Sequence, residues 1–119
     1  MLTFRAAPEV VEFGKYSELS DVWSFGIVVW EIYSYGKTPY ATMNNTEAFE
    51  QVTKGYRLPQ PADCPNEIYK LMRECWNIDV NKRPHFKQIY TKLYALLYVK
   101  NTANYNNSQV NEPKENVYN

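Results

Sequence analysis

The most continuous hydrophobic segment of the chain lies between residues 21 and 34. Apolar side chains in and beside this segment fall on every side of a helical wheel: Leu19, Val22, Trp23, Phe25, Ile27, Val28, Val29, Trp30, Ile32 and Tyr33. Such a helix is either buried at the centre of a protein or spans a membrane. A span needs about 20 apolar residues, whereas Asp21 and Glu31 bound a shorter run. We therefore predict a central buried helix over residues 21–34.

Both ends of this central helix carry capping residues. Ser20 directly precedes Asp21 and is a better N-cap candidate than Ser17, because a serine hydroxyl accepts an unpaired backbone N–H of the first turn. Asp21 lies where backbone N–H groups lack partners, a position that favours a negative charge. Gly36 is the predicted carboxyl-terminal cap.

Four further helical segments are predicted, and no segment shows sustained strand alternation. Their starts are indicated by capping residues and by prolines at first helical positions: Pro8, Asn44 or Asn45, Pro65 and Pro84. The segment after Pro65 repeats its apolar residues as an amphipathic helix does: Ile68, Leu71, Met72, Cys75 and Trp76. The sequence predicts an all-α fold of about five helices round a central buried one.

The helical period stops after Leu97, and the composition changes there. Of the 22 residues from 98 to 119, 7 are asparagine. An Asn-rich segment without an apolar period cannot bury enough surface to offset its ordering entropy. We predict a folded domain over residues 1–97 and a disordered tail over residues 98–119.

Composition excludes several classes of function. Thirteen basic and thirteen acidic residues cancel, so no general charge attracts nucleic acid or an anionic membrane. Cys64 and Cys75, with a single histidine in the chain, lack the spacing of a zinc site and fit a reducing compartment. No secretory signal or membrane segment is visible. We expect a soluble intracellular protein that binds no nucleic acid.

Short motifs, taken in order, resemble the carboxyl-terminal lobe of protein kinases. They are Ala7-Pro8-Glu9, Ser20-Asp21-Val-Trp-Ser-Phe-Gly26, Cys75-Trp76 and Lys82-Arg83-Pro84. The A-P-E element alone is a weak match. The W-S-F-G form and the segment Glu31-Ile-Tyr-Ser-Tyr-Gly-Lys-Thr-Pro-Tyr40 resemble the tyrosine-kinase branch, among its Src-like and receptor-type members. The resemblance covers residues 4 to about 97 and implies the helical lobe of a kinase-like fold.

The resemblance assigns roles to several residues. It implies that Glu9 and Arg83 form a buried ion pair. The alternative is that they are two unrelated surface charges. It implies that Asp21 anchors the catalytic loop, a role compatible with simple helix capping. It places substrate docking on the segment of Phe4, Arg5, Ala6, Ala7 and Pro8. Tyrosine kinases usually carry tryptophan where this chain has Arg5, which puts that docking role in question.

The residues that transfer a phosphoryl group are missing from this chain. Transfer requires a metal-binding Asp, a catalytic-loop Asp and Asn, a phosphate-contacting Lys and a glycine-rich loop. The sequence contains no H-R-D or D-F-G, its four glycines are scattered, and His85 is expected on a helix surface. We expect no catalytic, cofactor or metal residue here, with ATP and magnesium bound by a full-length parent. In the family that the chain resembles, the catalytic loop and the helices before it cover one side of this lobe, and both are absent here. We therefore expect the helix face around Asp21, Trp23 and Ile27 to be exposed.

Two interpretations remain open at this point. In the first, the chain is a fragment of a cytoplasmic protein-tyrosine kinase (or the cytoplasmic side of a membrane-bound one) whose parent phosphorylates protein substrates. In the second, it is a non-catalytic docking or decoy module. Tyr105, followed by two asparagines, resembles the Tyr-x-Asn ligand of a Src-homology-2 adaptor, and Tyr118 is a second candidate for phosphorylation.

Overall fold

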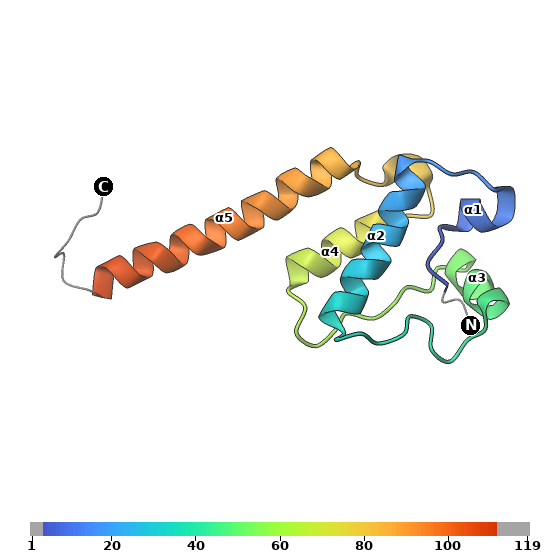
Figure 1. Ribbon diagram of the computed structural model, residues 1–119, viewed down its shortest axis with the longest axis horizontal. Coiled ribbons are helices and arrows are strands. Elements are labelled where there is room, and N and C mark those ends of the chain that lie inside the picture. Colours follow the sequence, from blue (N-terminus) through green and yellow to red (C-terminus); the bar gives the residue numbers. More distant parts are fainter. Residues whose placement is uncertain (1–3, 112–119) are drawn as a thin grey trace. The chain divides into compact units, whose positions relative to one another are not determined.

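The computed structural model describes residues 4–111 of the 119-residue chain. The secondary structure of this part is helical and includes no strand, which confirms the predicted all-α fold (Figure 1). Its elements, in order, are α1 (Pro8–Phe13), α2 (Glu18–Tyr33), α3 (Asn45–Thr53), α4 (Asn66–Cys75), the 3-10 turn η1 (Val80–Lys82) and α5 (Phe86–Asn111). The chain divides into two compact units between Phe86 and Lys87, and each is described by itself.

Helix α2 begins earlier than predicted, because Ser17 and not Ser20 is its N-cap. The Ser17 hydroxyl accepts the backbone N–H of Ser20 at 3.2 Å, and the Ser20 hydroxyl accepts that of Ser17 at 2.7 Å. The two serines therefore form a capping box, in which each side chain satisfies the other's backbone. The sequence prediction placed the N-cap at Ser20, which is the third residue of the helix.

The carboxyl end of α2 also differs from the prediction by one residue. Tyr35, with φ 58°, is the first left-handed residue after the helix, and Gly36 follows with φ 83°. The N–H of Gly36 bonds the Glu31 carbonyl at 2.9 Å and that of Tyr35 bonds Ile32 at 3.1 Å, the pattern of a Schellman motif. The Tyr35 hydroxyl donates to Asp63 at 2.7 Å. This hydrogen bond helps to hold Tyr35 in the left-handed conformation, which glycine usually adopts after a helix.

The core of the first unit lies between α2 and α4, which run side by side (Figure 1). From α2 it takes Val22, Trp23 and Ile27, and from α4 and its end Leu71, Met72, Cys75 and Trp76, all of them buried. Gly26 lies at the contact: a Cβ added there would be 2.7 Å from Trp76 Nε1 and 3.0 Å from Cys75 Cβ. Glycine is what lets the backbone of α2 approach α4 this closely.

The opposite side of α2 is exposed, contrary to the prediction that the helix is buried all round. Asp21, Val28 and Ile32 face solvent, and Ile32 is 66 % exposed. Their spacing of seven and four residues places them on one helical face. Trp23 and Ile27, which we expected to be uncovered, are completely buried. The exposed face is therefore a different one, because α4 covers the side that carries Trp23.

Helix α5 extends beyond the predicted end of the helical period at Leu97 and continues to Asn111. Once a helix has formed, each further residue adds a backbone hydrogen bond at little extra cost. Asparagine content alone was thus a poor guide to where the helix ends. Residues 112–119 lie outside the described part, and the division of the chain at residue 97 stays a prediction. Within residues 4–111, no helix is long and apolar enough to cross a membrane.

Candidate functional site

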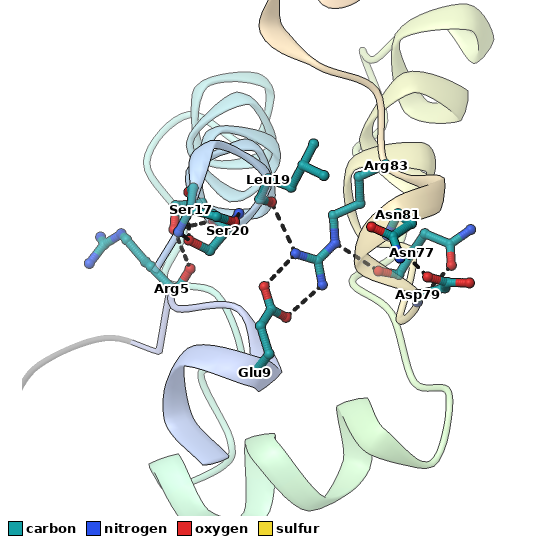
Figure 2. Close-up of polar contacts among 10 residues, drawn as sticks. Arg5, Glu9, Ser17, Leu19, Ser20, Asn77, Asp79, Asn81 and Arg83 are labelled. Carbon is teal, nitrogen blue, oxygen red and sulfur yellow. Dashed lines mark hydrogen bonds and ion pairs between the residues drawn. The ribbon is translucent and has the colours of Figure 1, made fainter. Parts of the chain in front are cut away.

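Arg83 and Glu9 form an ion pair that joins the two ends of the first unit (Figure 2). Arg83 Nη1 lies 2.7 Å from Glu9 Oε2, and Nη2 lies 2.8 Å from Oε1. The side chain of Arg83 is 0 % exposed and that of Glu9 13 %. A planar guanidinium that meets a carboxylate with two parallel bonds is the strongest geometry for such a pair.

Arg83 also donates hydrogen bonds to two backbone carbonyls. Nη1 also donates to the Leu19 carbonyl at 3.0 Å, and Nε donates to that of Asn77 at 2.8 Å (Figure 2). The turn that carries Arg83 is itself fixed, because Asp79 accepts the N–H of Asn81 at 3.0 Å. One buried side chain therefore links α1, the first turn of α2 and the connection after α4.

The ion pair holds the pKa of Glu9 below its ordinary value. Burial acts to raise this pKa, but the hydrogen bonds from Arg83 and from the backbone, together with the Arg83 charge, lower it by more. A glutamate in an unfolded chain has a pKa of about 4.3. The stabilisation from Glu9 is thus complete above about pH 4.3 and is lost as the pH falls through the lower folded-state pKa.

We therefore expect Glu9→Gln to flatten the acid limb of the stability curve. The variant is less stable at neutral pH, but its free energy of unfolding should fall less than that of the unaltered chain as the pH drops below about 4.3. Urea denaturation at a series of pH values measures this. Glu12→Gln, an exposed position on the same helix, is the matched control. If the free energy of unfolding fell equally with pH for Glu9→Gln and for the unaltered chain, the lowered pKa assigned to Glu9 would be contradicted.

Two guanidinium groups lie over the buried ring of Trp23. The centre of the Arg83 group is 5.0 Å from the ring centroid and that of Arg57 is 5.1 Å. Arg57 is held by the carbonyls of Trp76 and Val52, both at 2.9 Å. Burial lowers the pKa of Arg57. No sequence pattern singles out Arg57, because the Trp23 ring that it contacts lies far away along the chain.

The segment predicted to dock substrate lies against a hollow of about 420 Å³. The hollow is lined by residues of this segment, of α1, and of α3: Phe4, Arg5, Ala6, Val11, Asn45, Thr46 and Phe49. Ala7 and Pro8 are buried beside it. Phe4 is buried and packs edge-on against Tyr40, with ring centroids 5.6 Å apart. The structure thus brings this segment together with the start of α3, a neighbour that the sequence did not indicate.

Arg5 stands where tyrosine kinases usually carry tryptophan, and its side chain is engaged by α2. Its Nε and Nη2 lie 2.7 Å from the two carboxylate oxygens of Glu31. The Arg5 carbonyl accepts the Ser24 hydroxyl at 3.0 Å. Both contacts attach the docking segment to the central helix. Arg5 therefore holds this segment on the central helix.

The other predicted site residues lie apart from the ion pair. Asp21 is exposed, and within residues 4–111 its carboxylate makes no hydrogen bond or ion pair. His85 is on the surface and contacts Glu18, whose other carboxylate oxygen accepts the first N–H of α5 at 3.1 Å. Tyr105 belongs to the part of α5, residues 100–111, of which only the backbone is described, and Tyr118 lies outside the described residues.

The residues that transfer a phosphoryl group in kinases have no counterpart in the motifs of this sequence. Among residues 4–111, no three or more His, Cys, Asp or Glu side chains come together as metal ligands would. The sequence contains no D-F-G or H-R-D motif and no glycine-rich phosphate loop. That this chain binds neither ATP nor magnesium stays a prediction. What the arrangement provides is a rigid scaffold with a hollow at its surface.

Comparison with known proteins agrees with this arrangement. Residues 3–93 match the family described as protein tyrosine and serine/threonine kinase. The chain is 50% identical over 91 residues to ephrin type-A receptor 5 of Gallus gallus, and 48% identical over 91 residues to the same receptor of Homo sapiens. It is 48% identical over 88 residues to ephrin type-A receptor 10 of Mus musculus.

These matches take in 74–76% of the chain but only 9% of each relative. The chain belongs to the protein tyrosine and serine/threonine kinase family and corresponds to the carboxyl-terminal part of a tyrosine-kinase domain.

Proposed function

We propose that this chain is the substrate-holding part of a receptor-type protein-tyrosine kinase. The parent would transfer the γ-phosphoryl group of ATP, with magnesium, to tyrosines of protein substrates on the cytoplasmic side of a membrane. The similarity to ephrin receptors supports the receptor type and gives no support to a Src-like parent. ATP and magnesium would be held by residues outside this chain. Sequencing the transcript upstream of Met1 tests the parent, because it should encode H-R-D and D-F-G.

The hollow beside the Phe4–Ala6 backbone is the observation that carries the proposed role of this chain. Its lining is mostly apolar, with Phe4, Val11 and Phe49 contributing carbon surface. A substrate residue that follows the acceptor tyrosine would bury an apolar side chain there, which favours binding roughly in proportion to the area removed from water. The buried Glu9–Arg83 pair and the Arg5–Glu31 pair would keep the walls in place without substrate.

A peptide-binding measurement tests this role on the chain itself. We expect a fluorescent peptide with tyrosine followed by isoleucine to bind more tightly than one with tyrosine followed by aspartate, as measured by anisotropy. Phe49→Glu should remove the difference, because it puts a charge into the hollow. Glu50→Gln, on the neighbouring exposed position of α3, should leave it unchanged. Equal binding of the two peptides would contradict the proposal, and so would equal effects of the two substitutions.

A second proposed role concerns adaptors that recognise phosphotyrosine. The support is the sequence pattern Tyr105-Asn-Asn, since phosphorylation adds a charge of about −2 that an arginine cluster recognises. Tyr118 is the second position. Phosphorylated peptides around each tyrosine should bind a Src-homology-2 domain, while the unphosphorylated peptides should not. A phosphorylated Tyr105 peptide that binds no better than its unphosphorylated form would end this proposal.

A further inference from the structure

Helix α5 carries a charge that the composition of the whole chain conceals. Between Phe86 and Asn111 there are three lysines, Lys87, Lys92 and Lys100, and no aspartate or glutamate. The whole chain has equal numbers of basic and acidic residues. The helix is therefore a locally basic element of a neutral protein, and its own field favours an anionic partner.

The same helix carries a row of tyrosines. Tyr90, Tyr94 and Tyr98 follow one another at intervals of four residues, which places them along one face. Their rings stack: the centroids of Tyr90 and Tyr94 are 6.2 Å apart and those of Tyr94 and Tyr98 are 5.8 Å apart, with interplanar angles of 28° and 8°. The three residues are 69 %, 58 % and 59 % exposed. We call this row the tyrosine ladder.

Three kinds of partner could cover a basic and aromatic helix, and the geometry separates them. Nucleic-acid bases stack on free ring faces, whereas the rings of the ladder already stack on one another. A second copy that paired its α5 with this one would bring lysines against lysines, with no carboxylate on α5 to compensate. A lipid surface requires neither free ring faces nor carboxylates. Tyrosine is enriched at membrane–water interfaces, where an apolar ring with a polar end is favoured.

We propose that α5 lies along an anionic lipid surface through its tyrosine ladder. Leu97, exposed on α5 three residues after Tyr94, adds apolar surface beside the ladder, of the kind that enters the boundary between headgroups and acyl chains. The lysines supply attraction to phosphatidylserine-type headgroups, worth about fivefold in affinity for each lysine near the surface. This inference goes beyond peptide binding in the first unit and does not depend on it.

The test uses the complete 119-residue chain and vesicles of phosphatidylcholine with and without about 30 % phosphatidylserine. In co-sedimentation we expect binding to the anionic vesicles and little to the neutral ones, with binding reduced by added salt. Lys87→Gln combined with Lys100→Gln should weaken binding by about 25-fold. Tyr90→Ser, Tyr94→Ser and Tyr98→Ser together should reduce it to the level of the neutral vesicles. Tyr16→Ser, at an even more exposed tyrosine of the first unit, is the matched control.

Several outcomes would overturn the proposal. One is equal binding to neutral and anionic vesicles, and another is a triple tyrosine variant that binds as the unaltered chain does. Dimerisation in sedimentation velocity that the ladder substitutions abolish would assign the face to a second copy. Binding of oligouridine that the same substitutions abolish would assign it to nucleic acid. Circular dichroism shows whether the triple tyrosine variant keeps its helix. If the helix is lost, Tyr94→Ser alone tests the ladder, and we expect it to reduce vesicle binding by less than the triple variant does.

Discussion

Replacing Arg83 with methionine is expected to lower the free energy of unfolding by about 3–5 kcal/mol. The substitution leaves the Glu9 carboxylate in a largely buried position with no guanidinium opposite it. It also removes the donors to the Leu19 and Asn77 carbonyls and the cation over Trp23. Urea denaturation followed by tryptophan fluorescence measures the loss, since Trp23 lies in the core. A domain of this size has little more stability than that to lose.

Two further variants show whether the loss comes from a stranded charge. Arg5→Met breaks an ion pair of equally short distances at the surface, and its cost should stay below about 1 kcal/mol. The double variant Glu9→Gln with Arg83→Met should be more stable than Arg83→Met alone, because no unpaired carboxylate remains buried. A double variant less stable than Arg83→Met would contradict this explanation and would point to the lost carbonyl contacts instead.

Gly26→Ala is expected to destabilise the chain by about 1–3 kcal/mol, although alanine favours helices over glycine by about 1 kcal/mol. The added Cβ would lie 2.7 Å from Trp76 Nε1 and 3.0 Å from Cys75 Cβ, and both of these side chains are buried. Neither neighbour is the free end of a flexible chain, so α2 and α4 must separate. Thermal unfolding by circular dichroism measures the change.

Ile32→Ala is the matched control on the same helix. Ile32 is on the exposed face of α2, so its truncation should change the free energy of unfolding by no more than about 0.5 kcal/mol. If Gly26→Ala were at least as stable as the unaltered chain, the gain in helix propensity would outweigh the cost of the added Cβ against Trp76 and Cys75. The close packing of α2 on α4 would then not be as tight as described.

The sequence predicted the helices well because their signals are local. Pro8 at the first position of α1 was correct, and Asn44, one of the two caps considered for α3, is its cap, since a cap depends on residues within one turn. The cap of α2 shows the limit. Ser17 and Ser20 each satisfy the other's backbone N–H, and only the reciprocal geometry reveals which of them lies outside the helix.

The site depended on contacts that the sequence does not encode locally. A-P-E and K-R-P pointed to Glu9 and Arg83 only through the family resemblance, because no periodicity relates positions so far apart. Arg57 was missed because its role is defined by the ring of Trp23. The buried side of α2 could not be predicted either, since the helix carries apolar residues all round and only the position of α4 decides which of them are covered.

The sequence distance between Glu9 and Arg83, 74 residues, has a consequence for how the protein is made. At a ribosomal rate of about 5–20 residues per second, Arg83 is added about 4–15 s after Glu9. Until then α1 has no guanidinium to hold it, and the loop that their pairing closes must be closed against chain entropy. The early part of the chain therefore spends at least several seconds of synthesis without the ion pair that later holds α1.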